Sequence, residues 1–352
     1  MRLAYCPYML KFRNPAGTSR GVMTEKPTYL LKIWDEANPE IFGLGEASVF
    51  PGLSLEADGR YEYKVVELLA NIALGRATDL GAYPSLKFGL EQAINDFSNG
   101  GRGIYFPSSF TEGTATLRIN GLVWMGTASE MKERVREKLD AGFRCIKLKV
   151  GAISWEEELE MVRSLRNEFS PVDLEIRLDA NGGFPEQEAL QRLRELEPLA
   201  IHSIEQPVKP GTPDLMAMLC RESPIPIALD ESLIGLHSSG AKNMLLDYIA
   251  PQFIILKPTL CGGFSGAEEW IALAQKRGIG WWVTSALESN IGLNALAQWT
   301  ATLGNPMPQG LGTGQLFVNN LPSPLSLEGE TISFDRNFRR NPEIINSLDW
   351  RS

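Results

Sequence analysis

The stretch that decides the fold of this chain lies at residues 145–151 and reads CIKLKVG. Three apolar residues alternate with Lys147 and Lys149, as in a β-strand whose successive side chains point to opposite faces. The two lysines therefore point in the same direction. Strands inside a large chain usually carry apolar residues on both faces, so two ammonium groups on one face indicate a polar site.

The same pattern of strand, turn and amphipathic helix repeats along the chain from about residue 115. Eight strand-like segments follow it: TLRINGLVWMG, RCIKLKV, LEIRLDA, HSIEQPV, IPIALDES, QFIILKP, IGWWVTSA and, more weakly, PQGLGTG. Between the first two, Thr127 and Glu130 form a capping-box pattern that predicts the start of a helix, and Gly142 predicts its end.

This alternation predicts parallel strands with crossover helices, and eight such units predict a closed (β/α)₈ barrel of the α/β class. An open doubly wound sheet is the alternative, although its usual glycine-rich phosphate turn is missing.

The N-terminal part of the chain has a different rhythm. Residues 1–113 contain two or three strands and then helical stretches near 55–79 and 86–98, which together predict a separate α+β domain. The barrel is expected to occupy residues 114–318. Residues 319–352 are too few for a domain, and we expect them to pack back on the first domain as a tail.

Composition excludes several classes of protein. A net charge of -9 over 352 residues argues against nucleic acid as the main partner, because binding phosphates needs a basic surface. The sequence shows no signal peptide and no run of about 18 apolar residues that would cross a membrane. Four scattered cysteines suggest reduced thiols in the cytoplasm, and only two histidines leave acid–base chemistry mostly to Asp, Glu, Lys or Tyr.

Charged residues recur at the ends of successive predicted strands, 25 to 30 residues apart. They are Lys147 and Lys149, Asp179, Glu205, Asp230 and Lys257. Because each step is one βα unit, all six are expected at the carboxyl-terminal mouth of the barrel, where enzymes of this architecture place their active sites. A single strand-end carboxylate is usually a helix cap or a surface charge, but six residues in phase with the repeat favour a site.

Three of these residues suit a divalent cation. Burying the carboxylates of Asp179, Glu205 and Asp230 together costs several kcal/mol unless positive charge compensates them. Oxygen ligands with open positions suit Mg²⁺, and Mn²⁺ would also fit. Asn181 and Glu231 stand next to the predicted ligands, either to orient them or as plain helix caps.

The lysines flank this predicted metal site. Two ammonium groups close together lower each other's pKa, so Lys149 is predicted to act as a base, while Lys147 tunes it and helps to hold a substrate carboxylate. Lys257 would face them from the opposite side of the ring. The predicted reaction removes a proton from the carbon next to a carboxylate and passes through an enediolate.

The succession K-x-K, D-x-N, E-Q-P, D-E and K-P resembles the enolase superfamily, and within it the muconate-lactonizing-type subgroup with lysines on the second and sixth strands. The resemblance extends over nearly the whole chain. It implies a modified (β/α)₈ TIM-type barrel, an N-terminal α+β capping domain, and Mg²⁺ on Asp179, Glu205 and Asp230.

Three further segments, GTSRGVMTEKPTYLLKI, SALESNIG and GLGTGQLFVNN, are similar to the o-succinylbenzoate synthase family of this subgroup. That resemblance implies a hydro-lyase of menaquinone biosynthesis. It would eliminate water, in the syn sense, from 2-succinyl-6-hydroxy-2,4-cyclohexadiene-1-carboxylate. Lys149 would remove the α-proton, and Lys257 would stabilise the intermediate as a cation.

Specificity is expected from the loops around the mouth. Residues 15–21 form a glycine-containing loop that could close as a lid, with Ser19 and Arg20 near the succinyl end of the substrate. The residues proposed to hold the succinyl carboxylate are Ser285, Ser289, Asn290 and Gly292, which follow the seventh strand, and Gly312 at the eighth. Ordinary N-capping is the alternative for the residues after the seventh strand.

Other functions on the same scaffold stay open. An N-acylamino-acid racemase also needs lysines on both faces, whereas a dipeptide epimerase is less well supported because LGTGQLF contains no carboxylate. Muconate cycloisomerase and a non-catalytic binding protein are more remote. The expected partner is a small carboxylate, not nucleic acid or a membrane, and assembly into a homo-oligomer is left open.

Overall fold

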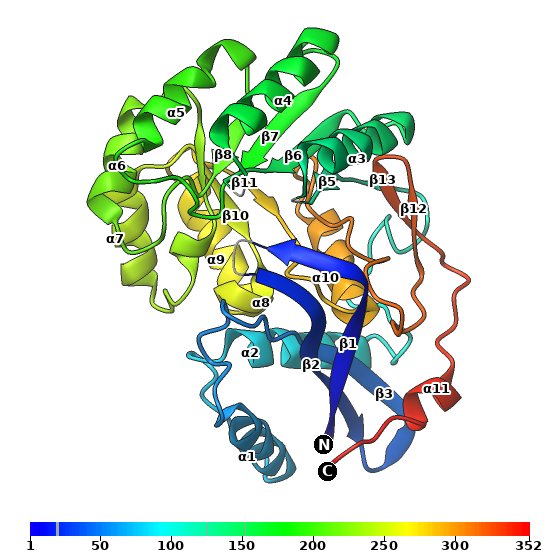
Figure 1. Cartoon of the computed structure of the whole chain (residues 1–352). Helices are drawn as coiled ribbons and strands as arrows, with labels where there is room; N and C mark the ends of the chain where they lie inside the picture. Colours follow the sequence, from blue (N-terminus) through cyan, green and yellow to red (C-terminus); the bar gives the residue numbers. More distant parts are fainter. Residues whose placement is uncertain (19–20, 125, 152) are drawn as a thin grey trace.

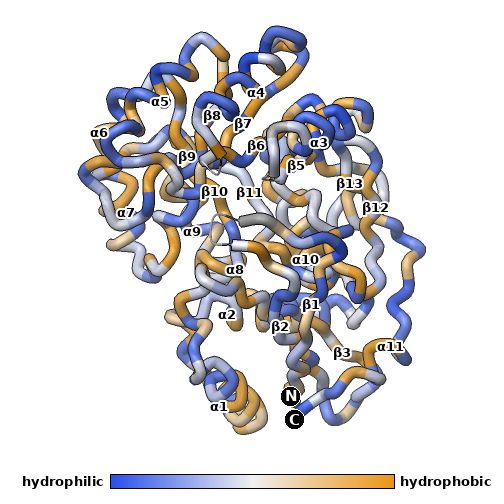
Figure 2. The backbone as a smooth tube through the Cα atoms, viewed as in Figure 1, coloured by the Kyte–Doolittle hydropathy of each residue, from blue (hydrophilic) through white to orange (hydrophobic). Residues whose placement is uncertain are grey.

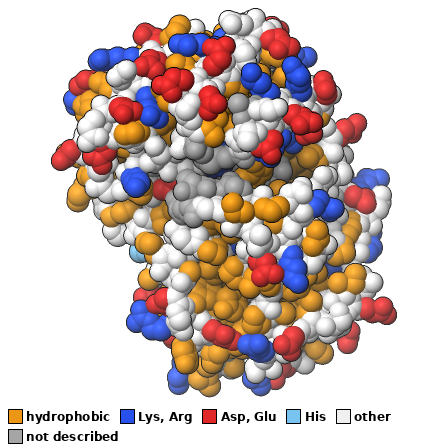
Figure 3. All heavy atoms as spheres, in the orientation of Figure 1, with side chains coloured by type: hydrophobic (Ala, Val, Ile, Leu, Met, Phe, Trp, Pro, Cys, Tyr) orange, Lys and Arg blue, Asp and Glu red, His pale blue; other side chains and the backbone are white. Residues whose placement is uncertain are grey.

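The computed structural model describes residues 1–18, 21–124, 126–151 and 153–352. The chain forms a curled parallel sheet surrounded by helices, and an antiparallel sheet lies beside it (Figure 1). In Figure 3 hydrophobic side chains gather over the antiparallel sheet, whereas charged ones are frequent over the outer helices of the barrel.

The antiparallel sheet is built from the N-terminal residues in the order β1-β2-β3. Its elements are β1 (Arg2–Thr18), β2 (Gly21–Asp35), β3 (Asn38–Ala47), α1 (Tyr61–Ala73) and α2 (Pro84–Ser98). Helix α2 lies so close to β3 that a Cβ atom on Gly45 would come within 1.9 Å of the carbonyl oxygen of Gly89. Glycine at these positions therefore allows the helix to cover the sheet.

The barrel contains seven regular strands among the described residues, and each neighbouring pair is parallel. They are β5 (Gly121–Val123), β6 (Cys145–Lys149), β7 (Glu175–Asp179), β8 (Ser203–Glu205), β9 (Ile227–Leu229), β10 (Phe253–Leu256) and β11 (Gly280–Val283). Their order in the sheet follows their order in the chain, as predicted for a βα repeat.

The eighth strand is reduced to two bridges. Gln309 pairs with Ile119 beside β5, and Gly310 pairs with Thr284 beside β11, both in the parallel sense. The Gln309 amide donates to the carbonyl of Arg118 at 2.9 Å. These contacts close the ring at the segment whose strand pattern was weakest in the sequence.

Helices follow the strands on the outside of the barrel. They are α3 (Ala128–Asp140), α4 (Trp155–Glu168), α5 (Ala189–Glu195), α6 (Pro213–Glu222), α7 (Ser239–Ile249), α8 (Pro258–Cys261), α9 (Gly263–Gln275) and α10 (Asn290–Thr302), with 3₁₀ turns η1 (Glu197–Leu199) and η2 (Glu231–Leu233). Figure 2 shows hydrophilic and hydrophobic residues alternating along several of them, as in amphipathic helices. The capping box of Thr127 and Glu130 is confirmed at the start of α3.

The C-terminal residues run to two destinations. A hairpin of β12 (Leu325–Glu328) and β13 (Thr331–Phe334) pairs with β4 (Leu117–Arg118) beside the barrel. The chain then passes through α11 (Pro342–Asn346) and returns to β1, where the Tyr5 amide donates to the carbonyl of Arg351 at 2.9 Å. Figure 1 accordingly shows the two termini side by side. The domain limits given above stay a prediction.

Two carboxylates of the first domain bind the N-termini of barrel helices. Glu91 accepts a hydrogen bond from the Phe264 amide at 2.6 Å, in the first turn of α9. Glu46 accepts from the amides of Ser289 and Gly292, both at 2.9 Å, at the start of α10. Negative charge is favourable at helix N-termini, so these contacts hold the first domain against the mouth of the barrel.

Candidate active site

The six charged residues predicted from the strand ends all lie at the mouth of the barrel. They are Lys147 and Lys149 on β6, Asp179 at the end of β7, Glu205 at the end of β8, Asp230 directly after β9 and Lys257 directly after β10. Because β6 and β10 lie four places apart in an eight-membered ring, their lysines face each other across the mouth.

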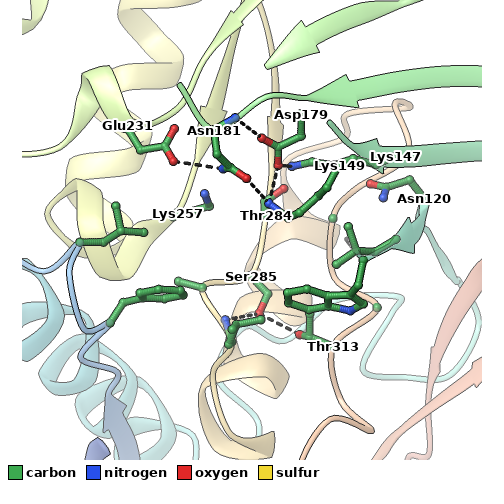
Figure 4. A pocket seen from close by; sticks show the side chains of 18 residues that line it. Asn120, Lys147, Lys149, Asp179, Asn181, Glu231, Lys257, Thr284, Ser285 and Thr313 are labelled. Carbon is green, nitrogen blue, oxygen red and sulfur yellow. Dashed lines mark hydrogen bonds and ion pairs between the residues drawn. The ribbon is translucent and has the colours of Figure 1, made fainter. Parts of the chain in front are cut away.

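Strand β6 has the two faces that its alternating sequence predicts. Ile146, Leu148 and Val150 are completely buried in the hydrophobic core. Lys147 and Lys149 both line the pocket at the mouth (Figure 4). The pair of ammonium groups therefore belongs to a site rather than to a solvated sheet edge.

Each of the three lysines forms an ion pair with a carboxylate. The Lys147 ammonium lies 2.9 Å from Oδ2 of Asp179 and also donates to Glu205. The Lys149 ammonium lies 2.9 Å from the same Asp179 oxygen, and Lys257 donates to Asp230. These ion pairs compensate carboxylates that are almost fully buried.

The shared ion pairs shift the pKa values of this cluster. Burial raises the pKa of Asp179, but Lys147 and Lys149 outweigh it and hold that pKa below its ordinary value. Burial, followed by the charge of Asp179, raises the pKa of Glu205 well above its ordinary value. The two carboxylates thus differ although they lie on adjacent strands, because the two lysines reach Asp179.

The expected lowering of a lysine pKa is not observed for Lys147. Burial, the largest single cause, lowers its pKa, but the charges of Asp179 and Glu205 together outweigh burial and raise the pKa above the ordinary value. Repulsion from Lys257 is the smaller effect. The carboxylates that contact Lys147 directly therefore outweigh the neighbouring ammonium groups, which is why the predicted lowering does not occur.

The three carboxylates are the type of ligand that Mg²⁺ prefers, although they are not gathered around one point. Within the described ranges no three Asp, Glu, His or Cys side chains are gathered closely enough to hold a metal ion, and lysines are bonded to all three carboxylates. Oε1 of Glu205, however, is buried without a hydrogen-bond partner, so one oxygen remains available as a ligand. A set of carboxylate oxygens without His or Cys suits Mg²⁺ rather than zinc.

Asn181 connects Lys149 to Glu231. The Lys149 ammonium donates to Oδ1 of Asn181 at 2.5 Å, and Nδ2 of Asn181 donates to Oε1 of Glu231 at 3.1 Å. Asn181 has a positive φ of 45°, a conformation that Asn tolerates better than most residues. Of the two interpretations left open by the sequence, this geometry supports an orienting role for Asn181 and Glu231.

The pocket beside these charges has an apolar part and a polar part. The apolar lining residues are Phe50, Leu53, Leu122, Trp124, Ala286 and Leu287, and the uncharged polar ones are Asn120, Asn181, Thr284, Ser285 and Thr313. Most of them were missed because sequence reasoning followed charges. Thr284 directly follows β11, so applying the strand-end rule to neutral residues would have found it.

The predicted substrate-binding residues divide into two groups. Ser285 and Gly312 line the pocket. Ser289 is completely buried and donates from its hydroxyl to Glu46 at 2.5 Å, and Asn290 donates from its side chain to the backbone of the C-terminal tail. Neither Ser289 nor Asn290 lines the pocket as described.

The helix N–H groups proposed to bind the succinyl carboxylate are already occupied. The Glu46 carboxylate accepts the amides of Ser289 and Gly292, so a side chain of the protein takes the position that we expected for the substrate. The alternative of N-capping applies to Ser289, whose hydroxyl oxygen accepts the Ile291 amide at 3.2 Å, and Glu46 of the first domain adds a second acceptor at this helix end. Ser19 and Arg20 of the proposed lid lie outside the described residues.

Comparison with known proteins agrees with this geometry. Residues 130–333, more than half of the chain, match the family model described as Enolase C-terminal domain-like. The chain belongs to the enolase superfamily. No helix among the described residues of this superfamily member is long and apolar enough to cross a membrane.

Individual superfamily members are similar over almost the whole chain. An o-succinylbenzoate synthase from Desulfotalea psychrophila is 44% identical over 94% of this chain and 98% of its own length. The crystal structure of MenC from the same organism has a TM-score of 0.85 at 40% identity, with 95% of this chain and 99% of that chain covered. Muconate lactonizing enzyme from Pseudomonas fluorescens shares the fold, with a TM-score of 0.80 at 21% identity and coverage of 99% and 98%.

Proposed function

We propose that this chain is an o-succinylbenzoate synthase of menaquinone biosynthesis, a hydro-lyase that removes water from 2-succinyl-6-hydroxy-2,4-cyclohexadiene-1-carboxylate. The observation that carries the choice of substrate is the 44% identity to a synthase over nearly the full length of both chains. The lysines and carboxylates at the barrel mouth are the groups that a proton abstraction next to a carboxylate requires.

Asp179, Glu205 and Asp230 are proposed to hold Mg²⁺, and Mn²⁺ has the same ligand preferences. When bound, the cation supplies positive charge beside the substrate carboxylate and so stabilises the negative charge that develops there. The orphaned oxygen of Glu205 supports this assignment.

Lys149 is proposed as the base. Its bonds to Asp179 and Asn181 hold the side chain in one place at the pocket wall. As a neutral amine, it takes the proton from carbon 1, the carbon that bears the carboxylate. The electron pair of that C–H bond first moves onto the carboxylate, which gives an enediolate. It then returns to form the new ring double bond as the bond from carbon 6 to its hydroxyl breaks. Lys149 then returns the proton to the departing hydroxide, which leaves as water from the same face.

Lys257 acts from the opposite side of the pocket. Its ammonium is bonded to Asp230, and carboxylates raise its pKa although burial lowers it, so it stays a cation. A fixed cation stabilises the negative charge that appears on the substrate when the proton leaves. Lys147, also a cation, is proposed to bind the substrate carboxylate.

Turnover tests this function directly. Purified protein should convert the cyclohexadiene to the aromatic product, followed by absorbance, with Mg²⁺ but not with EDTA. Lys149→Ala should lose this activity by about 10³-fold, the size expected for removal of a general base. Lys132→Ala, which removes an exposed lysine from the outside of α3, is the matched control and should retain it.

A folded, metal-loaded protein that leaves the cyclohexadiene unchanged would exclude the synthase. Incubation of N-acylamino acids in D₂O would then test the racemase. Within the described lining of the pocket, the eighth-strand segment contributes Gly310, Gly312 and Thr313, without a carboxylate for a substrate ammonium group. We propose a small carboxylate as the partner and the cytoplasm as the compartment, where four free, buried cysteines would stay reduced.

A further inference from the structure

A line of three polar side chains leads from the pocket into the buried junction between the two domains. Thr313 donates from its hydroxyl to Oγ of Ser285 at 2.8 Å, and Ser285 donates to Oε2 of Glu288 at 2.5 Å. Thr313 and Ser285 line the pocket (Figure 4), whereas Glu288 lies behind them and is completely buried. Ser285 was predicted to contact the substrate, whereas Thr313 and Glu288 have no role in the elimination as proposed.

The hydrogen bonds along these three side chains all run from donor to acceptor in one direction, away from the pocket. A serine hydroxyl has one proton and two lone pairs. The proton of Ser285 goes to Glu288, and its lone pairs accept from Thr313 and from the Leu287 amide at 3.0 Å. While Glu288 is a carboxylate, every proton therefore points away from the pocket. Thr313 then offers only lone pairs to a ligand and would repel a carboxylate or carbonyl oxygen.

A proton on Glu288 reverses this direction. The protonated acid donates to Ser285, Ser285 donates to Thr313, and Thr313 is left with a proton to donate into the pocket. The Ala286 amide, 2.9 Å from Oε2 of Glu288, keeps its acceptor in both states. The two hydroxyl protons of Ser285 and Thr313 are thus redirected without any movement of the side-chain heavy atoms.

The surroundings of Glu288 favour the proton. Burial raises its pKa, and its second oxygen, Oε1, is buried without a hydrogen-bond partner. The charged side chains that act on it come from the first domain: Lys26 of β2 lowers the pKa and Glu46 of β3 raises it. The Lys26 ammonium donates to Ser48 rather than to Glu288, so it does not neutralise the carboxylate by direct contact.

We propose that Glu288 is a positioning residue that, by carrying a proton, turns the Ser285–Thr313 pair into a hydrogen-bond donor for an acceptor oxygen of the substrate. The inference rests on the proposed function, whose substrate has a succinyl side chain with a ketone and a carboxylate as acceptors. The site would select ligands with an acceptor at this end over ligands with an ammonium group.

Calorimetric titration of o-succinylbenzoate into the Mg²⁺-loaded protein tests the proposal. Titrations from pH 6 to pH 9 in two buffers of different ionisation enthalpy count the protons taken up on binding. At pH values above the pKa of Glu288 in the free protein, the wild type should take up close to one more proton than Glu288→Gln. Its affinity should fall about tenfold per pH unit there, because binding then requires the proton. Glu288→Gln should lack both effects.

A second pair of variants separates this role from a structural one. Thr313→Val removes the terminal donor and should bind the product about tenfold more weakly at pH 6, the usual loss for a hydrogen bond to a charged group. Thr313→Ser keeps the hydroxyl and should bind like the wild type. Equal proton uptake by the wild type and Glu288→Gln, or unchanged affinity in Thr313→Val, would overturn the proposal.

The outcome is independent of the test of the proposed function. If the wild type turns over the cyclohexadiene but takes up no more protons on binding than Glu288→Gln, the proposed function stands and the proposed role of Glu288 is wrong. A folded protein that neither turns over the substrate nor binds the product loses both.

Discussion

Two buried clusters of charge lie next to each other in this molecule, and they are built differently. At the barrel mouth, lysine ammonium groups contact carboxylates directly, as in Lys147 with Asp179. At the junction between the domains, backbone amides and hydroxyls hold the carboxylates instead. Glu46 accepts two amides and the hydroxyls of Ser289 and Thr28, and the nearby Lys26 is bonded to a serine.

This difference indicates different tasks. At the mouth, each lysine and each carboxylate is held by an ion pair between side chains. Each side chain can exchange this ion pair for a contact with a substrate or a metal. Carboxylates bound by fixed amides have no such freedom, because backbone groups cannot leave their positions. The mouth cluster is therefore suited to chemistry, and Glu46 at the junction to holding one domain against the other.

The largest expected effect comes from the mouth. Lys257→Ala removes the fixed cation opposite Lys149 and should lower kcat by about 10²- to 10³-fold, as loss of an electrostatic stabiliser does. Steady-state turnover with Mg²⁺ measures this, and thermal unfolding of the same sample checks the fold. A kcat within threefold of the wild type would assign Lys257 to the structure of the mouth only.

Disrupting the junction between the domains should lower the stability of the protein and leave kcat unchanged. Glu46→Ala leaves the amides of Ser289 and Gly292 without an acceptor in a buried place and should lower the free energy of unfolding by about 2–4 kcal/mol. Urea unfolding gives this value. Turnover of the folded fraction should keep its kcat. Loss of kcat without loss of stability would show that the junction is part of the chemistry.

Metal binding should stabilise the mouth alone. At about 100 times its dissociation constant, Mg²⁺ should raise the free energy of unfolding by about 2.7 kcal/mol. Glu205→Gln removes a proposed ligand and should abolish most of that gain, whereas Glu91→Gln at the start of α9 should leave it unchanged. An unchanged Mg²⁺ effect in Glu205→Gln would remove Glu205 from the ligand set.

The smallest effect is a dependence of stability on pH at the junction. The pKa of Glu288 is raised in the folded protein, so its neutral form is favoured there. Its contribution to stability is full below the unfolded pKa of about 4.3 and is lost as pH rises through the folded pKa. Relative to Glu288→Gln, the wild type should therefore lose stability from pH 5 to pH 8. A constant difference between the two across this range would contradict the raised pKa.

Much of the fold and of the mouth could be predicted because both follow a period in the chain. Lys149, Asp179 and Glu205 end consecutive strands, and parallel strands bring their carboxyl ends to one edge whatever the helices between them contain. The same rule placed Asp230 and Lys257. The eighth strand had the weakest pattern, and there two bridges at Gln309 and Gly310 replace a regular ladder.

The sequence by itself determined the barrel and the charges at its mouth, since local periodicity and strand direction are sufficient to bring them together. Only the tertiary structure decided that Glu46 occupies the start of α10, although it stands 243 residues before Ser289. Tertiary structure alone also placed Glu288 behind Ser285 and within reach of the charge of Lys26. No period relates these residues, because the contact depends on how two separately built domains dock.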